Sequence, residues 1–252
     1  AVERSPSGVV TVTLNRPEVL NAANVRMHRE MSQIWRVIDE DDEARAALVT
    51  GAGRAFSAGG DLEMIEEMIS DHDALLTQLR DAGAIVEEVL SARKPIVSAI
   101  NGVAVGAGLA VALLADVSVI GASARISDGH TRLGVAAGDH AALLWPLLCG
   151  MARAKYYLLT SDFIDGPEAE RIGLVSRCVP DDQVLSEATA IAERLANGSP
   201  NAVRWTKRAL NQWMRQSLPI FGESLALEML GFAGPEAAEG LAAVRERREP
   251  RF

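Results

Sequence analysis

The feature that most constrains this chain's fold is a buried-type strand, a loop of small residues and a helix, occurring twice in succession. The first copy has a strand at residues 46–50, a loop at 51–60 and a helix capped by Asp61. The second has a strand at 96–100, a turn and glycine-rich stretch at 101–108, and an apolar helix that begins near Gly106. Strands that alternate with helices in this way predict an α/β core with parallel strand pairing.

The flanking segments extend this prediction. β-branched residues predict a strand at 9–14, a further strand is expected at 117–120, and apolar residues at helical spacing predict helices at 25–39, 61–69 and 73–90. Beyond residue 141 the chain is predicted to be mainly helical, at 169–173, 185–197, 202–213 and 218–232. The clearest break is Asn197-Gly198-Ser199-Pro200. We therefore expect a core at 1–197 and a C-terminal helical region at 198–252.

Composition excludes several classes of protein. A net charge of −9 disfavours a nucleic-acid partner. Two cysteines, Cys149 and Cys178, make neither a disulfide framework nor a metal cluster, so we expect no metal site and a reducing cytoplasmic location. The polar N-terminal residues do not resemble a secretory signal.

One apolar run is long enough to be mistaken for a membrane span. Residues 96–115 are uncharged. The Asn101-Gly102 turn signal and the glycines at 106 and 108 favour a strand, a turn and a buried helix instead, so we expect no membrane partner.

The two loops carry the first indication of chemistry. One reads R-A-F-S-A-G-G-D-L over residues 54–62, and the other reads N-G-V-A-V-G-A-G over 101–108. Each places backbone N–H groups at a helix N-terminus, where negative charge is favoured. Two such groups aimed at one point would form an oxyanion hole.

Together these motifs closely resemble the crotonase (enoyl-CoA hydratase/isomerase) superfamily. The likeness continues through Leu133-Gly134 and residues 155–160, 169–175, 206–208 and 247–252. It implies a spiral of ββα units and a C-terminal helical region that forms a homotrimer, or a hexamer as a dimer of trimers. It also implies an acyl-CoA substrate, with coenzyme A as part of the substrate and no separate cofactor.

The resemblance also assigns site residues. It implies that the amides of Ala58 and Ala107 hold the thioester oxygen. The substrate-binding residues that it implies are Ala58, Gly59, Gly60, Asp61, Leu62 and Ala107.

The chain departs from the family pattern where the reaction is decided. Enoyl-CoA hydratases of this family use two glutamates, and Ala110 and His130 stand at the corresponding positions. His130 and Asp139 have the nine-residue spacing of a histidine and an aspartate in a branch that cleaves cyclic β-diketones, represented by 6-oxocamphor hydrolase. A histidine near neutral pKa, oriented by a carboxylate, is suited to acid–base work, so both are candidate catalytic residues.

Simpler interpretations compete for the neighbouring polar residues. Asp128 and Asp139 suit turns or helix caps, and His140 suits an ordinary loop histidine. His28 and His72 are expected on helix surfaces with no role. Three functions therefore stay open: a hydratase or isomerase, a C–C bond hydrolase or thioesterase, and a catalytically inactive acyl-CoA-binding protein.

Overall fold

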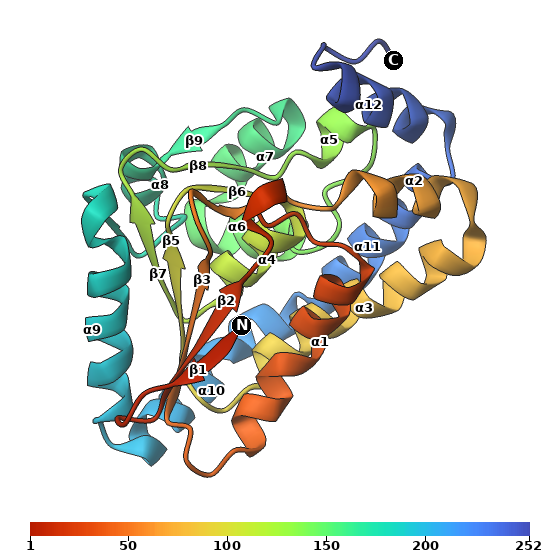
Figure 1. Ribbon diagram of the computed structural model, residues 1–252. Coiled ribbons are helices and arrows are strands. Elements are labelled where there is room, and N and C mark those ends of the chain that lie inside the picture. Colours follow the sequence, from red (N-terminus) through yellow and green to blue (C-terminus); the bar gives the residue numbers. More distant parts are fainter.

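The computed structural model describes residues 1–252 and is built around three consecutive strand–strand–helix units (Figure 1). The first unit comprises β3 (Ala46–Gly51), β4 (Ala55–Ser57), α2 (Leu62–Ser70) and α3 (His72–Ser91). The second comprises β5 (Ile96–Ile100), β6 (Val103–Val105) and α4 (Gly106–Leu114), and the third β7 (Val117–Gly121), β8 (Arg125–Ser127) and α5 (His130–Leu133). The expected ββα repeat is present.

The two strands of each unit belong to different sheets. The larger sheet has the order β1-β2-β3-β5-β7-β10, and the smaller has the order β4-β6-β8-β9. The strands outside the three units are β1 (Val2–Arg4), β2 (Val9–Leu14), β9 (Ile164–Asp165) and β10 (Arg177–Val179). Only the edge pairs β1–β2 and β8–β9 are antiparallel. The parallel pairing predicted from the sequence is confirmed.

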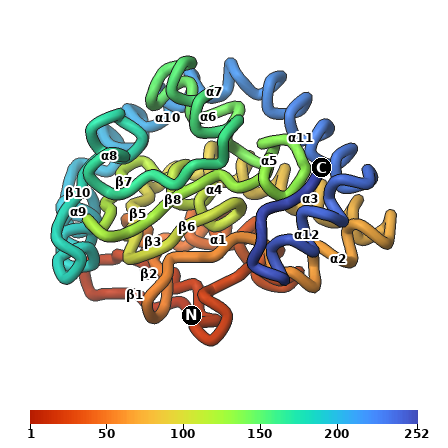
Figure 2. Tube along the Cα trace, turned by 90° about the horizontal axis from the view of Figure 1, so that it is seen from above, coloured from red at the N-terminus to blue at the C-terminus, as the bar shows by residue number.

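Helices cover both faces of the larger sheet (Figures 1 and 2). On one face, alternate residues such as Leu48 and Val97 pack against Ile191 of α9 (Val184–Ala196). Their neighbours, such as Val49, face the main core, to which Trp35 of α1 (Val25–Glu40) contributes. Because both faces are buried, the central strands are mainly apolar and show no polar alternation, and their few polar residues, Thr50, Ser98 and Ser118, are buried as well.

The second half of the chain is mainly helical. It contains α6 (Ala141–Cys149), α7 (Met151–Thr160), α8 (Gly166–Arg171), α10 (Pro200–Gln216), α11 (Leu218–Phe232) and α12 (Pro235–Glu246). Short 3-10 turns lie at Pro17–Val19 and Asp181–Gln183. The last three helices pack on the core. Lys207 of α10 forms a buried ion pair with Asp116 at 2.8 Å, and Asn211 donates to the Leu90 carbonyl at 3.1 Å.

Side chains cap the starts of two helices, and the cap expected at Asp61 is confirmed. The Asn24 side chain accepts from the Met27 N–H at 3.0 Å, and the Asp61 side chain accepts from the Glu63 N–H at 3.1 Å. The predictions missed the short strands β4 and β6 because both lie inside segments that were predicted to be loops.

Both cysteines are free.

No helix is both long and apolar enough to cross a bilayer. The uncharged run at 96–115 instead forms β5, β6 and α4.

Candidate active site

The two loops identified in the sequence lie in direct backbone contact. Gly59 and Gly106 both have positive φ, at 93° and 50°. A Cβ atom on Gly59 would lie 3.3 Å from the Val105 carbonyl oxygen, and one on Gly108 would lie 2.2 Å from the Ser57 Cβ. Side chains at these glycines would separate the loops, so the small residues bring the two segments together.

The hydrogen bonds of the first loop show which of its amides is free. The Ala58 N–H donates to the Leu20 carbonyl at 2.9 Å, and the Gly59 and Asp61 N–H groups also have acceptors. The Gly60 N–H has no hydrogen-bond acceptor in the protein. Ala58 was expected to supply the first oxyanion donor, but its N–H is already used in holding the loop. The structure therefore favours Gly60 as the donor.

The second loop supplies the partner amide. Ala107 is the second residue of α4, in the first turn, where N–H groups have no carbonyl partner within the helix. The N-cap residue is Val105, whose side chain cannot accept a hydrogen bond. The Ala107 N–H is thus available, and the positive end of the helix dipole lies beside it.

Both amide-bearing residues line one cavity of about 170 Å³ that is partly open to the surface. Its wall combines the two loops with side chains from α1, α2, α3, α5, α11 and α12: His28, Ala58, Gly59, Gly60, Leu62, Met64, Ile65, Met68, Gln78, Ala82, Val105, Gly106, Ala107, Asp128, Gly129, His130, Leu133, Asp139, Glu228, Met229, Phe232 and Val244. A larger surface groove of about 620 Å³ between the β1–β2 edge and α1 shares no lining residue with this cavity. The cavity, with its free amides, is the better candidate for chemistry.

Of the residues expected to bind substrate, Asp61 is placed differently. Ala58, Gly59, Gly60, Leu62 and Ala107 line the cavity, whereas Asp61 is not part of the wall.

The Asp61 carboxylate has two structural partners instead. Besides capping α2, it forms an ion pair with Arg16 at 2.7 Å. The carboxylate therefore supports the loop, and its role in binding substrate stays a prediction.

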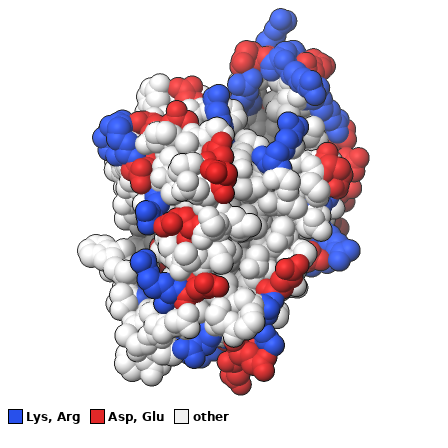
Figure 3. All heavy atoms as spheres, turned by 60° about the vertical axis from the view of Figure 1, so that its left-hand side comes forward, with Lys and Arg blue, Asp and Glu red and all other residues white.

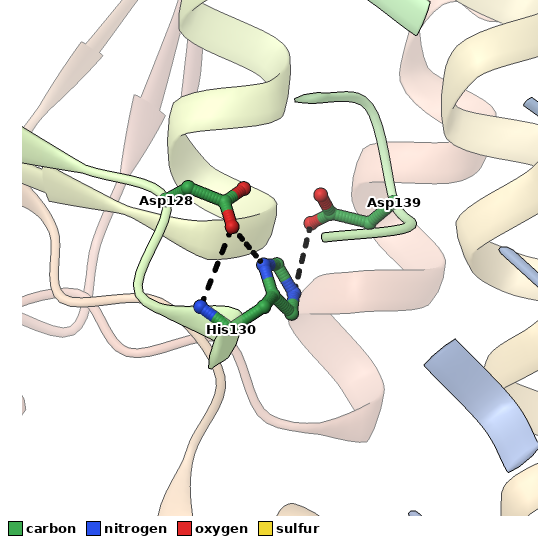
Figure 4. Close-up of side chains that lie close together, drawn as sticks. All are labelled: Asp128, His130 and Asp139. Atoms are coloured by element: carbon green, nitrogen blue, oxygen red, sulfur yellow. Dashed lines mark hydrogen bonds and ion pairs between the residues drawn. The ribbon is translucent and has the colours of Figure 1, made fainter. Parts of the chain in front are cut away.

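His130 lies at the first turn of α5 with its ring between two carboxylates (Figure 4). Its Nδ1 is 3.0 Å from Asp128 Oδ2, and the same oxygen accepts weakly from its backbone N–H at 3.4 Å. Nδ1 therefore carries a proton, and Nε2 faces Asp139. Asp128, interpreted from the sequence as a turn or cap residue, is the carboxylate that orients the imidazole.

Asp139 approaches His130 without hydrogen-bonding to it. The distance from its Oδ2 to His130 Nε2 is 3.8 Å. Its Oδ1 accepts from His140 Nδ1 at 2.5 Å, and His140 Nε2 in turn accepts from the Trp145 indole at 3.4 Å. His140 was interpreted as an ordinary loop histidine; it is fully buried and fixes Asp139 in place.

Glu228 of α11 completes the cluster and was missed in the sequence. It is buried, with Oε1 3.5 Å from His130 Nε2 and Oε2 without a hydrogen-bond partner in the protein. A signal was present, because Glu228 follows Phe221 by seven residues and Leu225 by three, and so falls on the apolar face of its helix. A lone charge on such a face calls for a functional explanation.

The charges of this cluster shift its pKa values in opposite directions. Burial alone would lower the pKa of His130, but the facing Asp128, Asp139 and Glu228 hold it well above its ordinary value. Burial raises the pKa of Glu228 to about 7, against the attraction of His130. Burial works to raise the pKa of Asp139 as well, yet His140 and His130 hold it far below the usual range. At neutral pH His130 is therefore cationic, Asp139 is anionic and Glu228 titrates.

Comparisons with known proteins identify the family of the chain that carries this site. The family model described as enoyl-CoA hydratase/isomerase matches residues 4–252. The chain belongs to the enoyl-CoA hydratase/isomerase family. It is 34% identical over 245 residues to a probable enoyl-CoA hydratase of Mycobacterium bovis, covering 96% of this chain and 93% of that protein. It is 31% identical over 249 residues to the 1,2-epoxyphenylacetyl-CoA isomerase of Escherichia coli, covering 97% and 95%.

Solved structures confirm the predicted α/β crotonase fold. An enoyl-CoA hydratase/isomerase from Mycobacterium paratuberculosis superposes with a TM-score of 0.92 at 34% identity, over 96% of both chains. The chain is thus an acyl-CoA enzyme of the enoyl-CoA hydratase/isomerase type.

This member of the enoyl-CoA hydratase/isomerase family offers no carboxylate at residue 110. Ala110 is buried in α4 and is not part of the cavity wall. The ionisable side chains on the wall are His28, Asp128, His130, Asp139 and Glu228.

The expectation for His28 was wrong, because it does not lie on the surface. It is 5% exposed and lines the cavity. Met31 and Trp35, three and seven residues further along α1, are buried on the same face, so the helical spacing itself carried the signal. His72, by contrast, is exposed as expected.

Three side chains of the cluster carry donor atoms of the kind that metal ions bind. Asp128, His130 and Asp139 offer donor atoms within 4.8 Å of one another. However, Asp128 faces Nδ1 and Asp139 faces Nε2 of the same ring. One ion binds only one ring nitrogen, so in this arrangement the nitrogen that it binds would face only one of the two carboxylates.

Proposed function

We propose that this chain binds an enoyl-CoA thioester with its carbonyl oxygen between the N–H groups of Gly60 and Ala107, and adds water across the double bond or moves that bond. The observation that carries the proposal is the pair of free amides on two touching loops that line one cavity. Donors that are fixed before the reaction stabilise the enolate at no cost of reorganisation.

His130 and Glu228 supply the proton transfers in this proposal. Hydration needs a base to take a proton from water as its oxygen bonds to Cβ, and an acid to protonate the enolate at Cα. The Glu228 carboxylate takes the first proton, because its pKa of about 7 suits exchange near neutral pH. The cationic His130 gives the second.

The two groups then restore each other. Their 3.5 Å separation lets the proton pass from Glu228 to His130, which returns both to their starting state. Asp128 holds the ring in the orientation that keeps Nε2 towards the cavity.

A series of enoyl-CoA esters tests this function. We expect loss of the conjugated thioester absorbance with crotonyl-CoA or with a small branched or cyclic enoyl-CoA. Binding of these esters without turnover of any would favour the inactive acyl-CoA-binding protein. Failure to bind any CoA ester would refute the proposal.

A second candidate is hydrolysis of a carbon–carbon bond in a cyclic β-diketone, or of a thioester. It is favoured by the approach of Asp139 to His130 in the same cavity, at 3.8 Å. In the first case water attacks one carbonyl and the other leaves as an enolate, held by the same amides. Mass spectrometry of a panel of β-diketones and saturated acyl-CoA esters decides between the candidates, because only hydrolysis releases acids from these compounds.

We also propose that the C-terminal region mediates assembly into a trimer or a pair of trimers. Helices α10 and α11 expose several large apolar side chains: Trp205, Leu210, Trp213, Ile220, Leu227 and Leu230. Exposed apolar surface of this extent favours a protein partner, and a second copy is the simplest one. Light scattering tests the mass, and a monomer at micromolar concentration would exclude this assembly.

A cytoplasmic location remains part of the proposal and rests on the unpaired cysteines. Cell fractionation tests the location.

Over the face shown in Figure 3, acidic and basic side chains are interspersed.

A further inference from the structure

Two hydrogen bonds in series lead from the protein core to Asp139. The Trp145 indole N–H donates to His140 Nε2 at 3.4 Å, and His140 Nδ1 lies 2.5 Å from Asp139 Oδ1. The side chains of Trp145 and His140 are completely buried. Neither residue lines the cavity, so any effect that the two have on the reaction passes through Asp139.

The indole determines where His140 carries its proton. An indole nitrogen only donates hydrogen bonds, so His140 Nε2 must accept with its lone pair. The ring proton is then on Nδ1, which donates to Asp139 Oδ1. His140 is therefore held as one neutral tautomer, with a partner for each ring nitrogen.

This tautomer favours one ionisation state of Asp139. A proton on Oδ1 would set a donor against the Nδ1 donor of His140, only 2.5 Å away. A proton on Oδ2 would face Nε2 of His130, which is itself protonated in the cationic ring, at 3.8 Å. The carboxylate has acceptors to offer on both sides and room for a proton on neither, so it stays an anion.

The fixed anion stabilises the charge on His130. Opposite charges at this separation favour the ionised form of both groups. The other titratable groups that face the pair are Asp128 before α5, Glu228 on α11 and His28 on α1. Because Glu228 titrates near neutral pH, it does not supply a constant negative charge. Asp139 does so, since His140 secures its ionised form.

We propose that Trp145 and His140 are positioning residues that keep Asp139 ionised, and that Asp139 in turn keeps His130 in the cationic form that protonates the substrate. Only the last step rests on the proposed function. The inference gives Asp139 an electrostatic role and no proton transfer of its own.

Nitrogen NMR of protein that is isotope-labelled in its histidine rings tests the hydrogen bonds without any substrate. The chain has four histidines, so a variant at each position assigns its signals. We expect His140 to be the neutral tautomer with its proton on Nδ1 throughout the neutral pH range. Trp145→Phe is expected to admit a proton at His140 Nε2. A proton on that nitrogen in the wild type would overturn the inference.

The pKa of His130, measured in the same spectra, tests the charge that reaches the active site. His140→Gln carries its amide at the position of Nε2 and withdraws the donor from Asp139, so we expect the pKa of His130 to fall by about one unit. His140→Asn carries an amide N–H at the position of Nδ1 and should restore it. His72→Asn, at an exposed position, is the control and leaves it unchanged. An unchanged pKa in folded His140→Gln, or equal falls in His140→Gln and His140→Asn, would overturn the inference.

Turnover separates this inference from the proposed function. The alkaline limb of the kcat pH profile is expected to move to lower pH in His140→Gln, by as much as the pKa of His130 falls. KM should change little, because His140 does not line the cavity. If the wild type turns over no CoA ester, the proposed function fails, and NMR still decides the roles of Trp145 and His140. If the pKa of His130 falls and the limb does not move, the proposed link from His140 to catalysis is overturned.

Discussion

The two walls of the cavity are built on different principles. The wall that carries Gly60 and Ala107 offers backbone N–H groups from two loops whose glycines allow close contact. The opposing cluster of His130, Asp139 and Glu228 offers side chains from α5, the segment before α6, and α11. The first wall depends on local backbone conformation, and the second on how distant segments pack. The amide wall thus presents a fixed pair of donors, whereas substitutions on any of three separate segments could alter the side-chain wall.

The largest effect is expected on the side-chain wall. His130→Ala removes the proposed acid and leaves three carboxylates facing one another, so kcat is expected to fall by roughly 10²–10⁴-fold. His72→Ala, at an exposed position on α3, is the matched control and leaves kcat unchanged. Initial rates with the best enoyl-CoA ester measure both. Unchanged activity in His130→Ala would remove this side chain from the mechanism.

The amide wall is tested by a substitution that removes an N–H and little else. Proline is tolerated in the first turn of a helix, so Ala107→Pro deletes the donor where α4 can accept the ring. We expect kcat to fall by about 10²–10³-fold, which is the usual effect of losing one oxyanion donor. Ala107→Gly keeps the N–H and is expected to retain activity. Equal losses in the two variants would mean that the side chain, and not the amide, matters at this position.

The same division explains how much could be predicted from the sequence. The small residues at 58–60 and 106–108 act through backbone conformation, which a local motif reveals, so both loops were located correctly. The residue pattern alone gave strand–loop–helix units and missed β4 and β6, and the ββα repeat was expected only from the family resemblance. Even there, the choice between the amides of Ala58 and Gly60 depended on the Leu20 carbonyl, nearly forty residues away, which no local pattern reveals.

The side-chain wall could be predicted only in part. The nine-residue spacing directed attention to His130 and Asp139, but spacing alone did not show that Asp128 takes the hydrogen bond. Glu228 enters from a helix almost a hundred residues later, and its helix was expected to serve assembly. A search for single polar residues on apolar helix faces would have found both His28 and Glu228.

A stability measurement tests the electrostatics of the side-chain wall. The pKa of Glu228 is raised from 4.5 to about 7 in the folded state. Its contribution to stability is therefore fully present below pH 4.5 and is lost as the pH rises towards 7. The corresponding loss is at most about 3 kcal/mol of unfolding free energy. Urea unfolding from pH 4.5 to 8 is expected to show a flatter profile for Glu228→Gln than for the wild type.

The control for this measurement lies on the same helix. Glu223→Gln, at an exposed position of α11, should follow the wild-type profile. Parallel profiles for the wild type and Glu228→Gln would show that Glu228 is not held in its protonated form by burial.

The smallest effect is expected at Asp61, which supports the first loop of the amide wall without lining the cavity. Asp61 caps α2 through the Glu63 N–H and pairs with Arg16, and it does not face the cavity. Asp61→Ala removes both contacts, so we expect a loss of about 1 kcal/mol in unfolding free energy. Asp61→Asn keeps the cap and should retain most of that stability. Calorimetry with a saturated acyl-CoA should show unchanged affinity in both variants, because the Gly60 N–H is still presented. A large loss of affinity in Asp61→Asn, with its stability intact, would instead place the carboxylate among the ligand contacts and weaken the division between a backbone wall and a side-chain wall.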